Sequence, residues 1–268
     1  MMRIAIITCV LTFIFQSATA QLVVDNSITL DDAMTLLLGP DVDYSNVTFT
    51  GAANQMGSFT SSGFDMGFPN GLILASGDCS MAPGPNNATG LSLGGGNFGA
   101  SDPDLDQLDG FLHNDAAILE FDFVATGSSV SFRYVWASEE YPEFSGADEN
   151  EDGFADCGDV SDVFGFFLSG PGIAGPFSNS ANNIALIPGS TTFVSIHNLN
   201  GGCDGMAVVG DTDCNFCEYY VNNEGLDAQF LEYLQYDGLT VTLVASYDGL
   251  QCGETYHIKL AMADVSDT

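Results

Sequence analysis

Residues 148–159 combine residue types and a spacing that could bind a calcium ion. Ca²⁺ takes about six to eight oxygen ligands, and calcium loops supply them from alternating positions of a short, sharply turned segment. Here loop positions 1, 3, 5, 9 and 12 carry side-chain oxygens, glycine at position 6 permits the turn, and position 7 offers a backbone carbonyl. The predicted calcium ligands are Asp148, Asn150, Asp152, Phe154, Asp156 and Asp159.

Position 12 of this loop distinguishes it from an EF-hand, which uses a bidentate glutamate there. Asp159 occupies that position, and in this respect the segment resembles the calcium loops of dockerins and thrombospondin type 3 repeats. The alternative interpretation is a solvated acidic loop in an acidic protein. The combination of five oxygen-bearing positions with the turn glycine favours calcium.

Two further carboxylates, Glu140 and Asp162, flank the loop and are predicted as secondary metal-binding or hydrogen-bonding groups. Adjacent residues of an extended strand point to opposite faces, so Glu139 and Glu140 should face different surroundings. A glycosidase would use such carboxylates as acid and base, about 5–9.5 Å apart in a cleft. Simple solvation remains an alternative. The acidic run at 102–109 is a weaker candidate for a cation site, because it lacks the turn glycine.

The first twenty residues predict export. Arg3 gives a positive start, residues 4–15 are apolar, and residues 18–20 form a small-residue cleavage site, as in a secretory signal peptide. The apolar run is too short to span a bilayer, and no later segment is apolar enough to do so. We therefore expect a mature chain that begins at Gln21 and is secreted, with no insertion into a membrane.

The charge balance limits the partners. The 268 residues include only 3 lysines and arginines against 36 acids, a formal net charge of −33. Nucleic acids and anionic membranes require a basic surface, so neither is expected as a partner. Calcium would offset part of the self-repulsion that such a charge creates in the compact state. The hydrophobic content of 46% argues against a disordered chain.

The cysteines fit an oxidising compartment. Of the 7 cysteines, Cys9 lies in the signal peptide, which leaves an even number in the mature chain. An even count in an exported protein predicts disulfides, although their pairing does not follow from the sequence. A zinc site would need further ligands that the sequence does not supply. The cysteines predicted to form disulfides are Cys79, Cys157, Cys203, Cys214, Cys217 and Cys252.

Hydrophobic patterning is almost entirely of the β type. One helix is predicted from Leu30, where apolar residues recur at helical spacing after Thr29 and Asp32, and Gly39 ends it. Residues 130–137 alternate between apolar and polar with a period of two. Other strands are predicted at 47–50, 72–75, 118–124, 162–168, 184–187, 192–197, 239–246 and 255–263. Short strands with long loops predict an all-β, jelly-roll-like sandwich.

Several segments resemble the choice-of-anchor L domain family in the same order along the chain. They lie at 130–144, 161–172, 183–189, 236–240 and 256–264. The resemblance implies a bacterial, exported, cell-surface protein and one such domain over 21–268. The family carries its anchor in a C-terminal module, and we expect a further closing strand after residue 268. The chain is therefore expected to be a fragment whose mode of attachment the sequence does not define.

These observations favour a non-catalytic, calcium-stabilised module for binding or adhesion to a glycan or protein at the cell surface or matrix. A glycan site would need exposed aromatic residues, and Tyr141, Phe144 and Tyr219 are candidates. The first alternative is a structural subunit of an extracellular matrix or filament, in which self-association would use an unpaired sheet edge or a donated strand. A glycoside hydrolase on the same sandwich is the second alternative.

Overall fold

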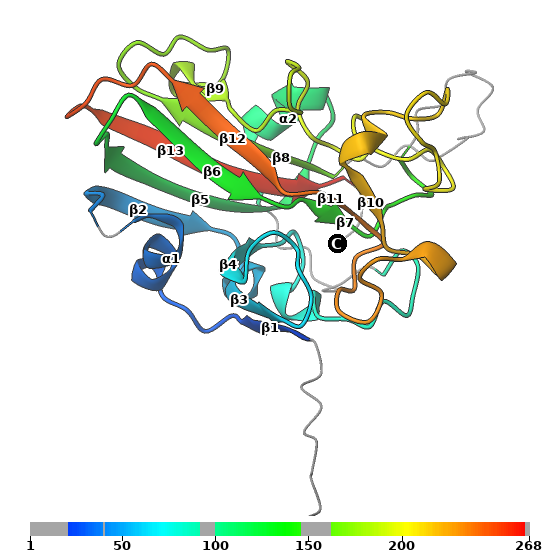
Figure 1. The fold of residues 1–268 in the computed structure, drawn as a ribbon. Coiled ribbons are helices and arrows are strands. Elements are labelled where there is room, and N and C mark those ends of the chain that lie inside the picture. Colours follow the sequence, from blue (N-terminus) through cyan, green and yellow to red (C-terminus); the bar gives the residue numbers. More distant parts are fainter. Residues whose placement is uncertain (1–20, 40, 92–99, 146–161, 266–268) are drawn as a thin grey trace, which may run out of the picture.

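A computed structural model of the chain describes residues 21–39, 41–91, 100–145 and 162–265. The strands form antiparallel sheets and only two α-helices are found among these residues, so the predicted all-β sandwich is confirmed. Figure 1 shows one long sheet at the back with shorter strands in front of it and below it.

The long sheet contains five antiparallel strands in the order β2, β5, β13, β8 and β9. Their bounds are Tyr44–Thr50, Asn114–Val124, Thr255–Asp264, Val163–Ser169 and Asn182–Asn183, in that order. Both faces of this sheet are covered. Leu119 and Leu260 belong to the main hydrophobic core on one face, whereas Ile118 and Ala261 join a smaller core on the other. This two-sided burial explains the nearly continuous apolar runs of β5 and β13.

A second layer packs on the long sheet. Its strands pair as β12–β6 and as β10–β11–β7. They span Leu243–Asp248, Ser129–Tyr134, Tyr220–Asn222, Gly238–Thr240 and Ala137–Ser138, in that order. The predicted alternation in β6 is confirmed, because Phe132 and Tyr134 point inward. Their rings lie 6.1 Å from Phe166 and 5.0 Å from Phe164 on β8.

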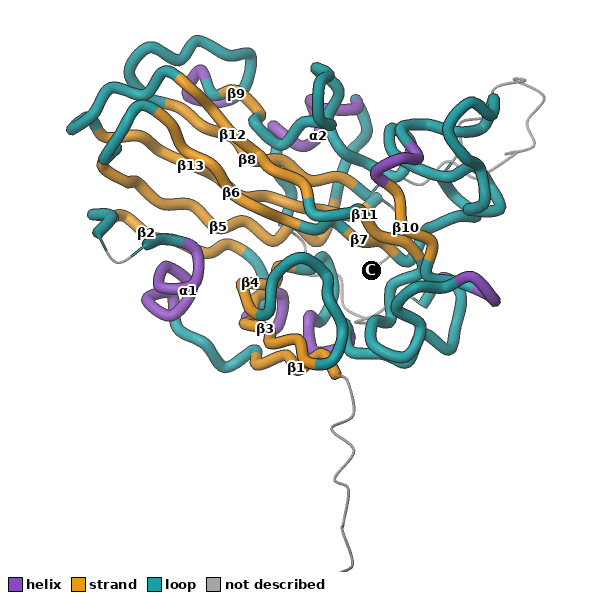
Figure 2. Tube along the Cα trace, viewed as in Figure 1, coloured by secondary structure: helices purple, strands orange, loops and turns teal. Residues whose placement is uncertain are grey.

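A third group of elements contains the N-terminal part of the described chain. Strands β1 (Gln21–Asp25), β3 (Met56–Ser62) and β4 (Asn70–Leu74) form a small sheet. Figure 2 shows it below the long sheet, beside helix α1 (Leu30–Leu37). The predicted helix and its cap are confirmed by a capping box. The Thr29 backbone N–H donates to the Asp32 carboxylate, and the Asp32 backbone N–H donates to Thr29 Oγ1.

Helix α2 (Pro103–Asp109) packs on the other face of the long sheet. It was not predicted, and it corrects the interpretation of the acidic run at 102–109 as a weaker candidate for a metal site. Asp102 caps its first turn and also binds the ammonium group of Lys259, at 2.6 and 2.7 Å. Asp104 contacts the same Nζ at 2.7 Å. The cation that these acids hold is therefore a lysine of β13.

Other differences concern short elements. Strands β1, β3, β9 and β10 were not predicted, and the segments at 184–187 and 192–197 make isolated bridges instead of regular strands. Single turns of 3-10 helix occur at Ala53–Gln55, Cys79–Met81, Ser178–Ser180, Cys217–Tyr219 and Gly225–Asp227.

Candidate functional site

The predicted calcium loop lies outside the described residues. All six of its ligands, from Asp148 to Asp159, and Cys157 fall within residues 146–161. The loop therefore remains a prediction. The structure does describe the residues on either side of it, including both secondary carboxylates.

Glu140 and Asp162 come together, and a third carboxylate joins them. One oxygen each of Glu140, Asp162 and Asp264 lies within 4.8 Å of the other two. Glu140 follows β7, Asp162 directly precedes β8, and Asp264 is the last residue of β13. These three residues, called the carboxylate trio below, lie after the end of β7, before the start of β8 and at the end of β13.

The hydroxyl group of Ser138 links two members of the carboxylate trio. Its Oγ lies in hydrogen-bond contact with Glu140 Oε2 and 2.7 Å from Asp162 Oδ2. A hydroxyl has one proton to donate, so a second proton or a cation is needed to bridge these oxygens. Burial raises the pKa of Asp162 to about 7, and the nearby charge of Asp264 contributes to this increase. The site can therefore hold a proton near neutral pH, and a bound cation would displace it.

Asp162 has an oxygen suited to a cation. Its Oδ1 is inaccessible to solvent and accepts no hydrogen bond from the described residues. A buried carboxylate oxygen without a partner costs free energy unless it is protonated or paired. Carboxylate and hydroxyl oxygens are ligands that Ca²⁺ accepts. The chemistry of the carboxylate trio and Ser138 thus matches a hard divalent cation.

Tyr141 holds the Glu139–Glu140 segment in place. It is fully buried, its hydroxyl donates to the carbonyl oxygen of Leu199, and its ring lies 5.6 Å from that of Trp136. Gly238 faces Ser138 across the β11–β7 pair, and a Cβ at Gly238 would come within 2.6 Å of the Tyr141 side chain. The close approach of Tyr141 to β11 therefore depends on a glycine at 238.

Glu139 belongs to a different acidic group, as expected for the neighbour of Glu140 on an extended segment. It is buried, and its Oε2 accepts from the backbone N–H of Leu91 at 3.4 Å. Burial raises the pKa of Glu139 to about 9, and the charge of Asp237 contributes. Burial also raises the pKa of Asp237 to about 6, although Asn86 donates to its Oδ1 at 2.7 Å.

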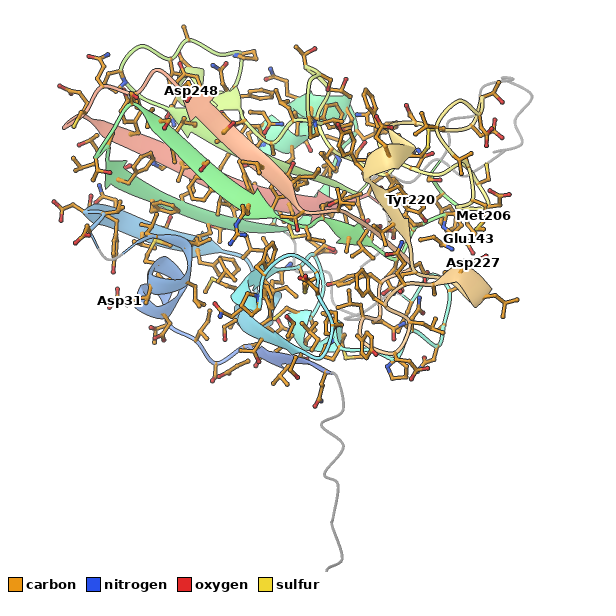
Figure 3. All side chains as sticks on the ribbon, in the orientation of Figure 1. Asp31, Glu143, Met206, Tyr220, Asp227 and Asp248 are labelled. Atoms are coloured by element: carbon orange, nitrogen blue, oxygen red, sulfur yellow. A yellow bond between two sulfur atoms is a disulfide. The ribbon has the colours of Figure 1, made fainter. Side chains whose placement is uncertain are left out.

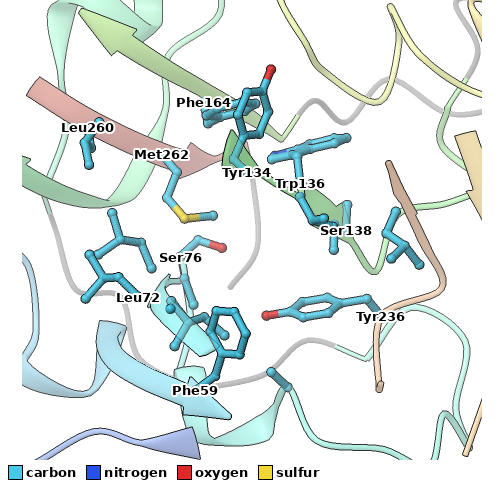
Figure 4. Close-up of a pocket in the computed structure, with 18 of the residues that line it drawn as sticks. Phe59, Leu72, Ser76, Tyr134, Trp136, Ser138, Phe164, Tyr236, Leu260 and Met262 are labelled. Atoms are coloured by element: carbon cyan, nitrogen blue, oxygen red, sulfur yellow. The ribbon is translucent and has the colours of Figure 1, made fainter. Parts of the chain in front are cut away.

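Both acidic groups border a cavity of about 560 Å³. Figure 4 shows apolar side chains around most of it, among them Leu72, Leu260, Met262 and Phe164. Glu139, Glu140, Asp162 and Asp264 also line it. The volume lies within the range of about 300–1,000 Å³ for ligand pockets, and the combination of apolar walls with a few polar groups is typical of them.

The aromatic residues proposed for a glycan site do not form one surface. Tyr141 is fully buried, Phe144 is 38% exposed, and Tyr219 is half-buried against the main core. Burial of Tyr141 corrects the expectation that it contacts a glycan. The expectation failed because the sequence does not show that Leu199 and Tyr220, far along the chain, contact the side chain of Tyr141.

The cysteines differ in part from the prediction. Cys214 and Cys217 form a disulfide, and Cys203 is also disulfide-bonded. Cys79 and Cys252 are free thiols, which corrects the prediction that all six are bonded. Cys79 is fully buried, and burial raises the pKa of its thiol to about 12, whereas Cys252 lies exposed in the turn between β12 and β13. An even number of cysteines predicts disulfides but does not show which cysteines lie close enough to pair.

Sequence reasoning missed two acids of the site, Asp264 and Asp237. Each lies far along the chain from Glu139 and Glu140, and no local spacing connects them. Both fall within segments that carry the family resemblance, at the end of 256–264 and within 236–240. Their position in those segments was the available signal.

Comparison with known proteins gives a family match over nearly the whole chain. The model of the choice-of-anchor L domain matches residues 19–268. No curated protein and no solved structure matches the chain. Among the described residues, no helix is both long enough and apolar enough to cross a bilayer. The extent of the match shows that the chain belongs to the choice-of-anchor L domain family.

Proposed function

We propose that this chain is an exported, calcium-stabilised module of the cell surface that binds a glycan or a protein and catalyses no reaction. Membership of the choice-of-anchor L family supports association with the cell surface. The predicted signal peptide supports export, and the predicted loop at 148–159 supports calcium.

One observation carries the calcium proposal. The carboxylate trio gathers three acids from separate elements of a protein that has few basic residues to balance them. Like charges at this separation repel one another and disfavour the folded state unless a proton or a cation intervenes. A Ca²⁺ ion at the trio would bind residues that follow β7, precede β8 and end β13, and so would hold these three strands together.

The trio places its oxygens close enough to share one cation, whereas a glycoside hydrolase needs two carboxyl groups on either side of a sugar bond. The oxygens of the trio lie within 4.8 Å of one another. Catalytic carboxyl groups are about 5–5.5 Å apart in retaining enzymes and about 6.5–9.5 Å apart in inverting ones. The remaining alternative, a matrix or filament subunit, would need self-association through sheet edges. The net charge of −33 on each copy opposes it.

Isothermal titration calorimetry, in which CaCl₂ is added to residues 21–268, tests the proposal. We expect binding with a dissociation constant near 10⁻⁴–10⁻³ M, on the order of extracellular calcium modules. Asp148→Ala with Asp152→Ala should remove the loop site, and Asp162→Asn with Asp264→Asn should remove the trio site.

The matched control carries Asp31→Asn and Asp248→Asn, which lie on the far side of the molecule from Glu143 and Asp227 (Figure 3). It removes the same number of charges but should bind calcium like the wild type. Absence of binding by the wild type would refute calcium stabilisation. Equal weakening in the control and in both site variants would mean that calcium only screens the net charge.

A further inference from the structure

The front layer of the sandwich is incomplete above the long sheet. Strand β6 covers β8 through contacts of Phe132 and Tyr134 with Phe166 and Phe164. Strand β4 belongs to a different sheet. Between β6 and β4 lies the 560 Å³ cavity, and Leu260 and Met262 of the central strand β13 form part of its wall (Figure 4). We call this cavity the β4–β6 groove.

The edge of β6 faces the groove. Among the described strands, β6 pairs with β12 alone and β4 pairs with β3 alone. All residues from 131 to 134 of β6 and from 70 to 74 of β4 line the groove. Side chains alternate between the faces of a strand, so a consecutive run of lining residues means that the strand borders the cavity with its edge. A strand edge presents N–H and C=O groups that can pair with another chain.

The groove offers apolar surface to whatever occupies it. Leu72 and Leu74 of β4, Phe166 of β8 and Met262 of β13 are only half-buried, although all pack against the main core. An added strand would place alternate side chains against these residues and its other side chains toward solvent. Burial of this partly exposed apolar surface would favour association.

The groove is strongly acidic beyond the C-terminal end of β6. Glu139, Glu140, Asp162 and Asp264 line it there, and Asp78 lines it from the β4 side. In contrast, Arg133 is the one basic residue that lines the groove in the described chain, and its guanidinium lies 5.8 Å above the ring of Phe68. A partner segment with a positive charge at the acidic end would therefore be favoured over one with a negative charge.

We propose that the β4–β6 groove binds an extended segment of a partner protein, which adds as a strand to the edge of β6 and places a lysine or arginine among the acids. The segment would carry apolar residues at alternating positions. If it runs antiparallel to β6, its basic residue lies at its N-terminal end. This inference rests on the binding role proposed above, and calcium at the trio would compete with the lysine for Glu140, Asp162 and Asp264.

The chemistry of the chain argues for a partner other than a second copy. The whole sequence contains 3 lysines and arginines, and one of them, Lys259, is buried in an ion pair. Two copies with a charge of −33 each would also repel one another. The complementary segment must therefore come from a more basic protein.

A synthetic probe can test the inference directly. The probe is the N-acetylated, C-amidated peptide Lys-Val-Thr-Val-Thr-Val with a fluorescent label, titrated in EDTA and again in calcium. Binding is followed by anisotropy and by the fluorescence of Trp136, the single tryptophan of the chain, which lines the groove. We expect saturable binding with one peptide per chain.

Two altered peptides separate strand pairing from other modes of binding. Methylation of alternate backbone nitrogens keeps the side chains but removes hydrogen-bond donors, and we expect binding to weaken about tenfold or more. Replacement of the lysine by glutamate should weaken it by a similar factor of about ten. If the methylated peptide binds as tightly as the unmethylated one, binding does not use strand pairing, and the proposal is overturned. The groove would then be an apolar pocket of the kind that binds a lipid or a small ligand.

Two variants place the binding in the groove. Met262→Trp and Leu72→Trp fill it from opposite walls, and each should weaken binding about tenfold or more while the melting temperature shows that the chain is folded. The matched control is Val244→Trp, because Val244 is 50% exposed on β12 and does not line the groove. Binding that survives both groove variants, or that the control weakens equally, would refute the site. Loss of peptide binding with an intact calcium response would refute this inference alone.

Discussion

Lys259 shows how single residues determine the stability of this acidic protein. Its side chain is 10% exposed, and its ammonium group contacts Asp102 and Asp104 at 2.6–2.7 Å. Nζ also lies 4.8 Å from the ring centre of Phe167. The hydrogen bonds to Lys259 and Ser178 hold the pKa of Asp104 below its ordinary value, although burial acts in the opposite direction. One lysine therefore fixes α2 to β13.

Removal of this lysine should be costly. We expect Lys259→Met to lower the free energy of unfolding by about 3–5 kcal/mol, because it leaves two buried carboxylates without a counter-charge. Urea denaturation measures the change. Combination with Asp102→Asn and Asp104→Asn should restore part of the loss, since asparagine can still cap α2. A cost below about 1 kcal/mol for Lys259→Met would contradict a buried, hydrogen-bonded pair.

His113 gives a pH-dependent contribution of definite sign. Burial opposes its charged form, but Asp109 and Asp106, with N···O distances of 3.2 and 3.1 Å, outweigh burial and raise its pKa. A raised pKa in the folded state stabilises the protein fully below the unfolded value of about 6.5, and this stabilisation is lost as pH rises through the folded pKa.

The stability difference between the wild type and His113→Gln should therefore shrink as the pH increases from about 5.5 to 9. Thermal melts across this range measure it, and both proteins share every other titrating group. A difference that stays constant, or that grows with pH, would show that His113 is neutral when folded.

At the scale of elements, the success of the predictions depended on periodicity and length. Strands β5, β6, β8 and β13 were predicted because they show long apolar runs or a clear period of two. The segment 192–197 has a similar apolar pattern but makes only bridges, through Phe193 and Ser195. A strand requires a partner at the right register, and sequence patterning does not show that partner.

Helix α2 was missed because its seven residues are too few to show a helical period. Its ends did contain readable signals, namely an aspartate cap at 102, proline at the first helical position and glycine at 110 with φ 89°. The run of aspartates drew attention to metal binding instead. Two members of the carboxylate trio, Glu140 and Asp162, were predicted as secondary metal-binding or hydrogen-bonding groups. Asp264 was not, because only the fold brings the end of β13 close to them.

The cap of α1 offers a test at this scale. Thr29→Ala removes a side chain that accepts from Asp32 N at 3.2 Å, and we expect a loss of about 1 kcal/mol. Thr35→Ala is the matched control, since Thr35 is an exposed residue within the same helix and alanine is the better helix former. Equal effects of both substitutions in chemical denaturation would show that the capping box does not stabilise α1.

For the molecule as a whole, net charge is the main physical difficulty. The formal net charge is −33, and the described residues form few ion pairs that could compensate it. The ion pairs of Lys259 with Asp102 and Asp104 are buried. Acidic side chains occur at both ends of the molecule, as Asp31, Asp248, Glu143 and Asp227 show in Figure 3. A divalent cation would act where the repulsion is most concentrated, at the carboxylate trio and the predicted loop.

The most direct test of calcium stabilisation is a thermal melt of residues 21–268 in calcium and in EDTA, compared with the Asp148→Ala/Asp152→Ala and Asp162→Asn/Asp264→Asn variants. An ion that binds only the folded state adds about 2.7 kcal/mol at 100 times its dissociation constant. We predict a higher melting temperature in calcium for the wild type and a smaller increase for each variant. Identical wild-type curves in calcium and EDTA would contradict the account.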